Sequence, residues 1–365
     1  MTSSPVTVLA VGDLQLGDSP TTVGYGFYSR YRARPIANLL GVVRDSSKGT
    51  DVVFGNLETS LEAPRPGEAS REGLQLRGDA AFARDLRAVG FTVMNVANNH
   101  ATQHGVQAFH ATVAALASAG IACCGIRGSN GWASDPAMVL GGRVGVLGYC
   151  LRPRQYSPDV PPYAEGDRES IVTDVTRLAA TGCSVLVSLH WGEEFVPAPS
   201  EDEVALAHAI IDAGARMILG HHPHVTRPVE QYRRGIVAYS LGNFIGDMVW
   251  YRPFRTGAIV RCTIDGASVK SAAISATHLQ DDYRPVLTAE PAVPPMPSSE
   301  LPVLTATEYA NAIRRTWRRQ RLASYRFALA NAWRTPPRIL LQLVADTLRN
   351  KLAPSRAQKP GAAPD

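Results

Sequence analysis

The sequence is poor in cysteine and has no long apolar run. Its 365 residues include five cysteines, an odd number without the spacing of a disulfide framework. Cys150, Cys183 and Cys262 lie in apolar runs, where cysteine acts as a small core residue. No stretch of about 18 uninterrupted apolar residues exists, so no membrane-spanning helix is predicted. The N-terminal residues also lack a secretory signal pattern, and we expect a cytoplasmic protein.

Three common catalytic and nucleotide-binding motifs are absent as well. There is no G-x-x-x-x-G-K-[ST] loop, no G-x-G-x-x-G between a first strand and a helix, and no G-x-S-x-G elbow. These absences argue against a P-loop NTPase, a dinucleotide-binding domain and an α/β-hydrolase. Aromatic residues lie among the arginines of the C-terminal part, but no nucleic-acid fold signature accompanies them, so no nucleic-acid partner is expected.

What the sequence does contain is an alternation of short apolar runs and amphipathic segments. The amphipathic segments 80–90, 106–120 and 201–215 end at or next to a glycine, as helices commonly do. Near-continuous apolar strands separated by helices are typical of a sheet that is covered on both faces. The sequence therefore predicts a layered α/β fold. The strand-like runs are 6–11, 51–55, 91–97, 144–150, 184–189, 216–220 and 235–241.

The composition changes near residue 286, and four regions are predicted. Residues 1–285 form the main α/β domain, 286–303 a Pro/Ser-rich linker, 304–352 a basic helical extension and 353–365 a disordered tail. From residue 301 onward, 12 Lys and Arg stand against 3 Asp and Glu, whereas the first 300 residues hold 25 against 29. This asymmetry predicts an anionic partner for the C-terminal part.

Carboxylate, carboxamide and imidazole side chains follow several of the predicted strands. Each one alone has an ordinary explanation as a helix cap, a turn residue or a loop histidine. Ligands of open α/β sheets bind at the carboxyl ends of the strands, so these side chains are expected to converge. Oxygen and imidazole ligands together suit a divalent Mn, Fe or Zn ion, and their number suffices for one or two ions. The residues are Asp13, Asn56, Glu58, Asn98, Asn99, His100, His190, Glu193, Glu194, His221, His222, His224, Asn243 and Asp247.

The short motifs that contain these residues, taken in their order along the chain, resemble those of the bacterial capsule-biosynthesis CapA family, the poly-γ-glutamate accessory proteins. That family looks like a branch of the calcineurin-like metallophosphoesterases. The resemblance covers roughly residues 6 to 280, and five motifs in one order make it specific. They are "VGD" at 11–13, "GNLETSL" at 55–61, "ANNHATQHG" at 97–105, "HWGEEF" at 190–195, and "GHHPHV" with "YSLGNF" near the C-terminal end of the domain.

The resemblance implies a metallophosphoesterase-like sandwich of β-sheets flanked by helices, and it assigns roles to individual residues. His100 follows a ligand asparagine, as the catalytic histidine of the phosphoesterase Asn-His motif does, and takes the role of general acid or transition-state stabiliser. Glu194 is implied to be a ligand, a general base or a partner that orients His190. The residues implied as metal ligands are Asp13, Glu58, Asn99, His190, His222 and His224.

The sequence departs from the family pattern at four positions. Gln15 stands where the phosphoesterase Asp-x-His opening has its histidine, so one imidazole is missing. Asn56 stands where phosphoesterases often bridge two metals with aspartate. Gln103 and His104 occupy positions where the family usually has Asp and Tyr. The first two departures bear on whether one ion or two are bound.

Three functions are compatible with these observations. The first is a metal-dependent hydrolase of a phosphoester or of a γ-glutamyl or peptide-like amide, in capsule polymer or related biosynthesis. The second is a non-catalytic accessory protein that binds an acidic polymer or a synthase partner. The third is a tailoring enzyme of a small-molecule pathway, with a small phosphorylated or glutamyl substrate.

The basic extension is predicted to be helical over 308–333 and again over 338–352. Two interpretations are open: the segment covers an edge of the main domain, with its arginines paired to acidic groups, or it lies on an anionic membrane at the inner face or grips an acidic chain such as polyglutamate. A partly apolar stripe accompanies the arginines and consists of Ile313, Trp317, Leu322, Tyr325, Leu329 and Trp333.

Overall fold

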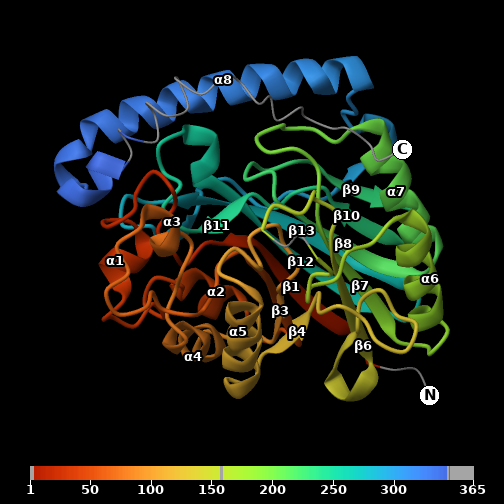
Figure 1. The fold of residues 1–365 in the computed structure, drawn as a ribbon. Coiled ribbons are helices and arrows are strands. Elements are labelled where there is room, and N and C mark those ends of the chain that lie inside the picture. Colours follow the sequence, from red (N-terminus) through yellow and green to blue (C-terminus); the bar gives the residue numbers. More distant parts are fainter. Residues whose placement is uncertain (1–3, 157–158, 343–344, 346–365) are drawn as a thin grey trace.

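The computed structural model describes residues 4–156, 159–342 and 345, and two β-sheets packed face to face form its centre (Figure 1). The first sheet has the strand order β14-β13-β12-β1-β2-β3-β4, with β11 paired to β1. The second has the order β15-β9-β10-β8-β7-β6-β5. Helices cover both outer faces, so the predicted layered α/β fold with two sheets is confirmed.

The strands of the first sheet are mostly parallel around β1, and a long antiparallel pair extends one side. Its members are β1 (Val6–Leu14), β2 (Val52–Leu57), β3 (Val93–Asn95), β4 (Ala122–Cys124), β11 (Asn243–Ile245), β12 (Thr256–Asp265), β13 (Ser268–Leu279) and β14 (Pro285–Leu287). The second sheet consists of β5 (Ala137–Val139), β6 (Val144–Cys150), β7 (Ser184–His190), β8 (Ala215–His221), β9 (Val229–Tyr232), β10 (Gly235–Ala238) and β15 (Met296–Pro297).

Two groups of helices form the outer layers. Helices α1, α2, α4 and α5 pack on the first sheet, and α6 and α7 pack on the second. The helices are α1 (Phe27–Tyr31), α2 (Gly41–Ser46), α3 (Arg71–Leu74), α4 (Ala81–Ala88), α5 (Val106–Ser118), α6 (Arg168–Ala179), α7 (Glu201–Asp212) and α8 (Ala306–Ala330). Among the described residues, no helix combines the length and apolarity needed to cross a membrane.

The alternation of side chains along β1 shows why its sequence is apolar throughout. Val8 and Ala10 point into the layer between the two sheets, whereas Leu9 and Val11 point into the core beneath the helices. Successive side chains of a strand face opposite sides, so a central strand must be apolar on both. Full burial of one such aliphatic side chain stabilises the fold by roughly 1.5–3 kcal/mol.

The seven predicted strands are present, but the pair β12 and β13 was not predicted. β13 keeps much of its length half-exposed or exposed, and its sequence SVKSAAISATHL contains small and polar residues. A strand with one face toward water lacks the continuous apolar run that marks a central strand. Composition alone therefore missed this part of the first sheet.

The parallel strands of both sheets bring their carboxyl ends together. Asp13 at the end of β1 lies beside Asn56 of β2 and Asn243 of β11 in the strand register. At the corresponding end of the second sheet, His190 of β7 lies beside His221 of β8. The strand ends that carry polar side chains thus meet at one edge of the sandwich.

The C-terminal part of the described chain runs over both sheets. Within the predicted linker, Val293 pairs with Ile274 of the first sheet and β15 pairs with β9 of the second. Helix α8 corresponds to the predicted helix over 308–333 and lies across the molecule (Figure 1). The domain boundaries stay a prediction, and the tail over 353–365 lies outside the described residues, as does most of the helix predicted over 338–352.

Candidate metal centre

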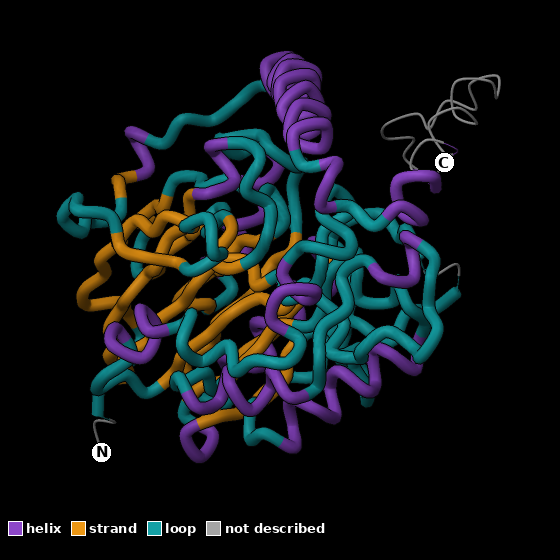
Figure 2. Tube along the Cα trace, turned by 90° about the vertical axis from the view of Figure 1, so that its left-hand side faces the viewer, coloured by secondary structure: helices purple, strands orange, loops and turns teal. Residues whose placement is uncertain are grey.

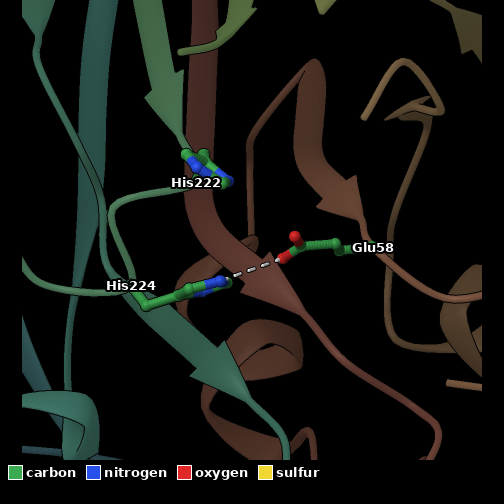
Figure 3. Close-up of side chains that lie close together, drawn as sticks. All are labelled: Glu58, His222 and His224. Atoms are coloured by element: carbon green, nitrogen blue, oxygen red, sulfur yellow. Dashed lines mark ion pairs between the residues drawn. The ribbon is translucent and has the colours of Figure 1, made fainter. Parts of the chain in front are cut away.

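Three buried side chains from two loops form the tightest group of potential metal ligands. Glu58 follows β2, and His222 and His224 follow β8. One ligand atom from each residue lies within 4.8 Å of the others. Figure 3 shows the three side chains reaching toward one another, with His224 Nε2 3.8 Å from Glu58 Oε2. Two imidazoles and a carboxylate are a ligand set that Zn, Mn and Fe accept.

Asp13 lies beside this group and connects to both strands around it. Its Oδ1 atom is 3.0 Å from His221 Nδ1 and accepts a hydrogen bond of 2.9 Å from the Asn56 amide. Its Oδ2 atom accepts a hydrogen bond from the backbone N–H of His222 and lies 3.4 Å from His224 Nδ1. The Asp13 carboxylate therefore fixes the loop that carries the histidines.

His190 and Asn99 complete the other side of the group. His190 Nε2 is 2.8 Å from Asn99 Oδ1 and 3.5 Å from Glu58 Oε1. The His190 and His222 ring centroids are 4.8 Å apart. All six residues implied as metal ligands therefore lie in one buried cluster, and their role as ligands stays a prediction.

Several buried polar atoms of the cluster have no hydrogen-bond partner. Both ring nitrogens of His222 are unpartnered although this residue is only 2% exposed. A buried polar atom without a partner costs about 1–3 kcal/mol, so such a cluster calls for an additional group. A divalent cation would satisfy the unpartnered oxygens and, on each neutral imidazole, the one ring nitrogen that carries a lone pair. The unpartnered atoms are Gln15 Oε1, Glu58 Oε1, His221 Nε2, His222 Nδ1 and His222 Nε2.

The two carboxyl groups of the cluster have shifted pKa values in opposite directions. Burial raises the pKa of Glu58 to about 8, and the negative charge of Asp13 adds to the effect. Burial also acts to raise the pKa of Asp13, but the hydrogen bonds with His221 and His224 outweigh it and hold the pKa well below its usual range. Without a bound cation, ionising one of the two carboxyl groups therefore costs less free energy than ionising both.

Burial and neighbouring charge also shift the pKa values of the imidazoles in opposite directions. Burial lowers the pKa of His190 and of His222 well below the usual value, so both rings are neutral at neutral pH. For His224 the effect of burial is outweighed by the charges of Glu58 and Asp13, which raise its pKa. A neutral imidazole is the form that binds a metal, and a bound cation would replace the proton on His224.

His100 lies at the edge of the cluster and is oriented by Gln103. Its Nδ1 atom is 2.8 Å from Gln103 Oε1, and its Nε2 atom is 4.0 Å from Glu58 Oε1. Since a carboxamide oxygen only accepts, Nδ1 carries the proton and Nε2 has a free lone pair. Burial lowers the pKa of His100 to about 4, so the ring is neutral.

The loop after β7 carries Glu193 and Glu194 and is held from two sides. Arg152 Nη1 lies 2.8 Å from Glu193 Oε1, and the Tyr309 hydroxyl of α8 accepts a hydrogen bond from the Glu193 backbone N–H. Burial raises the pKa of Glu194, which stands outside the three-residue ligand group. Its role stays a prediction.

Some residues that shape the site were not singled out as functional. Asn95 donates a hydrogen bond of 2.8 Å to Asn56 Oδ1, and Gln155 accepts one of 3.1 Å from Asn99. The buried guanidinium of Arg227 contacts Glu203 at 2.7 Å and Tyr309 at 3.2 Å. Asn95 is a polar residue inside the apolar run predicted over 91–97, which is a signal that could have found it, whereas Arg227 has no such signal.

The loop that carries the histidines has an unusual backbone. His222 has a φ angle of 94° and His224 one of 56°, both in the left-handed region that favours glycine. Non-glycine residues in this region cost of order 1–3 kcal/mol and cluster at functional sites. Local strain at two imidazoles of the ligand group is thus a second, independent sign of a site.

Fold and geometry together define a layered α/β protein with a buried candidate metal centre at the carboxyl ends of its strands. The model of the family described as "Bacterial capsule synthesis protein PGA_cap" matches residues 7–248. The chain therefore belongs to this family, and the resemblance seen in the motifs is confirmed.

Two curated relatives are named as CapA proteins, which agrees with the family match. The capsule biosynthesis protein CapA of Bacillus anthracis is 28% identical over 300 residues, which are 78% of this chain and 67% of the relative. The PGA biosynthesis protein CapA of Bacillus subtilis (strain 168) is 31% identical over 223 residues, 59% of this chain and 58% of the relative. The chain thus matches about three fifths to two thirds of the length of these relatives.

A solved structure gives a more distant likeness. Haemophilus influenzae NAD nucleotidase aligns with a TM-score of 0.40 and 12% sequence identity, over 85% of this chain and 62% of that chain. A likeness at this level carries no argument about activity.

Proposed function

We propose that this protein is a metal-dependent hydrolase that acts on a phosphoester or a peptide-like amide in the biosynthesis of an acidic capsule polymer. The observation that carries the proposal is the group of Glu58, His222 and His224, whose ligand atoms lie within 4.8 Å of one another and include unpartnered ring nitrogens. Membership in the capsule synthesis family and the names of the two CapA relatives support the polymer context.

The residues of the cluster suit the binding of one or two divalent ions. Glu58 lies 3.5 Å from His190 and 3.8 Å from His224. Asp13 lies 3.4 Å from His224, and Asn99 contacts His190. A bound divalent ion polarises the target oxygen and lowers the pKa of water to about 7.

His100 is the candidate for proton transfer. Gln103 holds the Nδ1 proton, so the Nε2 atom is the one that accepts a proton from the attacking water and returns it to the leaving group. Gln103, which departs from the family pattern, therefore orients His100 through its carboxamide oxygen. Glu194 is the alternative base, since its carboxyl group also has a raised pKa.

The first experiment is metal analysis of the purified protein. We expect bound Mn, Fe or Zn in the wild type and its loss in His222→Ala. His110→Ala is a matched control, because His110 is exposed on α5 outside the cluster. Metal content near zero in all three proteins would contradict the proposal.

The second experiment separates the bond classes. Phosphoesters and γ-glutamyl amides are assayed with added Mn²⁺, and His100→Gln is expected to keep the metal and lose turnover. A non-catalytic accessory protein is the second candidate, favoured by Gln15 and Asn56, which replace an imidazole and a bridging carboxylate. Full metal content, no turnover on any substrate and tight binding of polyglutamate would favour that candidate.

A further inference from the structure

Helix α8 presents two different faces. Its inward face packs on the site loops: Tyr309 bonds to the Glu193 backbone, and the Trp317 ring lies 5.0 Å from that of Phe195. Phe327 contacts Trp250 further along, at 6.1 Å between ring centroids. Figure 2 shows the helix end-on at the outer surface of the molecule, so the opposite face points away from both sheets.

The first half of the outward face is strongly basic. Glu308 is the single acidic residue of α8, against six arginines. Within the part of the chain that the structure describes, no ion pair involves any of these six arginines. A shallow hollow of about 550 Å³ lies along this half, lined by Asn311, Arg314, Arg315, Arg318 and Arg319.

The second half of the outward face exposes mainly apolar side chains, with Arg326 among them. Leu322 and Tyr325 are about half exposed, Leu329 is 78% exposed and Trp333, just beyond the helix, is 84% exposed. These four residues belong to the apolar stripe found in the sequence, and they point to solvent instead of packing on the main domain. The extension does cover the main domain, but the prediction that its arginines pair with acidic groups there is wrong for the described residues.

A basic half followed by an apolar half fits an anionic bilayer better than an acidic polymer. An acidic polymer such as polyglutamate offers carboxylates to the arginines and leaves exposed leucine and tryptophan without a complementary surface. A bilayer with anionic headgroups offers both, because an interfacial helix buries its apolar side chains at the acyl boundary and keeps arginine among the headgroups. Trp and Tyr are also the aromatic residues that favour this interface.

We propose that the outward face of α8 from Arg314 onward, together with Trp333 just beyond the helix, docks on an anionic lipid surface. The basic half contacts the headgroups, and Leu322, Leu329 and Trp333 enter the interfacial layer. Because the inward face of the same helix holds the loop of Glu193 and Phe195, docking places the candidate metal centre close to the membrane. This inference is independent of the proposed hydrolase activity.

The test is sedimentation of the full chain with vesicles. We expect binding to vesicles of phosphatidylcholine and phosphatidylglycerol in equal parts at low salt, and release at high salt as the Debye length shortens. Arg315→Gln with Arg318→Gln is expected to lower the affinity ~10-fold or more. Leu329→Glu is expected to lower it as well, because a charge replaces an inserted apolar side chain.

A matched double variant controls for the loss of charge in general. Arg84 on α4 and Arg168 on α6 are exposed and distant from α8 in sequence, so Arg84→Gln with Arg168→Gln is expected to bind like the wild type. Equal binding to pure phosphatidylcholine, wild-type binding by Leu329→Glu, or retention of soluble polyglutamate with no vesicle binding would each overturn the proposal. Unchanged circular dichroism shows that each variant is folded.

Discussion

Asp18 with Asp247 and Asp13 with Glu58 are two pairs of buried acids whose surroundings differ. Asp18 and Asp247 accept hydrogen bonds from backbone N–H groups and from hydroxyls, such as the Gly24 N–H at 2.8 Å and the Phe27 N–H at 3.0 Å. Asp13 and Glu58 face imidazoles and carboxamides, and Glu58 Oε1 has no hydrogen-bond partner. Both pairs are buried, so burial does not tell them apart.

The two pairs differ in whether hydrogen-bond donors satisfy all of their carboxylate oxygens. Around Asp18 and Asp247, donors of the loop between β1 and α1 and of α1 itself already satisfy the carboxyl groups, and these acids fix the loop. Asp13 also accepts hydrogen bonds, but Glu58 Oε1 beside it and the ring nitrogens of His222 have no hydrogen-bond partner. A buried acid therefore indicates a cation site only when its neighbours are ligands as well.

The largest effect that would test this comparison is on metal binding. Asp13→Asn is expected to lower metal affinity ~100-fold, since it removes a charge next to the ligand group. Asp247→Asn, an equally buried change, is expected to leave metal affinity unchanged. Titration of the metal-free proteins with Zn²⁺ or Mn²⁺ measures both. Equal losses in the two variants would remove the distinction between the pairs.

The second effect concerns the pH dependence of stability. Burial and the charge of Asp18 raise the pKa of Asp247 from 3.8 to about 6. The folded protein then holds a proton on this group that the unfolded chain releases, so its stabilising contribution is present below pH 4 and is lost as the pH rises to 6. By linkage the loss amounts to about 3 kcal/mol.

Asp247→Asn is neutral at every pH and is expected to lack this dependence. Urea unfolding of wild type and variant between pH 4 and pH 7 gives the difference in unfolding free energy. A difference that stays constant over this range would contradict the shifted pKa.

A smaller effect is expected at Gln15, where the phosphoesterase Asp-x-His opening has an imidazole. Gln15 is buried beside Glu58, with its amide nitrogen 3.3 Å from Glu58 Oε2 and its Oε1 atom unpartnered. Gln15→His places an imidazole at this position and is expected to raise metal affinity or the bound equivalents, by ~10-fold in affinity. Gln103→His, outside the ligand group, is the control and is expected to give no gain.

The smallest effect is expected at the contact between α8 and the site loop. Trp317→Ala removes an aromatic pair with Phe195, whose ring lies 6.3 Å from that of His224. Such a pair contributes about 1 kcal/mol, so thermal unfolding should shift by a few degrees. Trp333→Ala, which removes an exposed ring, should leave the unfolding temperature in place.

The sequence predicted the central strands and the position of the site because both depend on local patterns. The apolar run before Gly220 marks β8, and a histidine that follows a parallel strand must lie at the ligand edge. Contacts between segments that are far apart in the sequence produce no local pattern that would predict them. Tyr309 bonds to Glu193 across 116 positions, and neither residue type predicts the other.

Side-chain orientation on α8 was the other limit of sequence reasoning. Helical spacing grouped Leu322, Leu329 and Trp333 on one stripe, but spacing alone does not say whether a stripe faces the protein or solvent. The contacts of Tyr309 and Phe327 determine which face of α8 packs on the main domain, and their partners lie in loops far away along the chain.

The left-handed backbone at His222 and His224 has a consequence for laboratory evolution. Glycine adopts these φ angles freely, so His222→Gly is expected to relieve backbone strain that His222→Ala retains. Selection of a random library for heat resistance alone should therefore enrich glycine at positions 222 and 224. Selection that also requires a bound ion should retain histidine there, and the two sets of survivors would diverge at the same two codons.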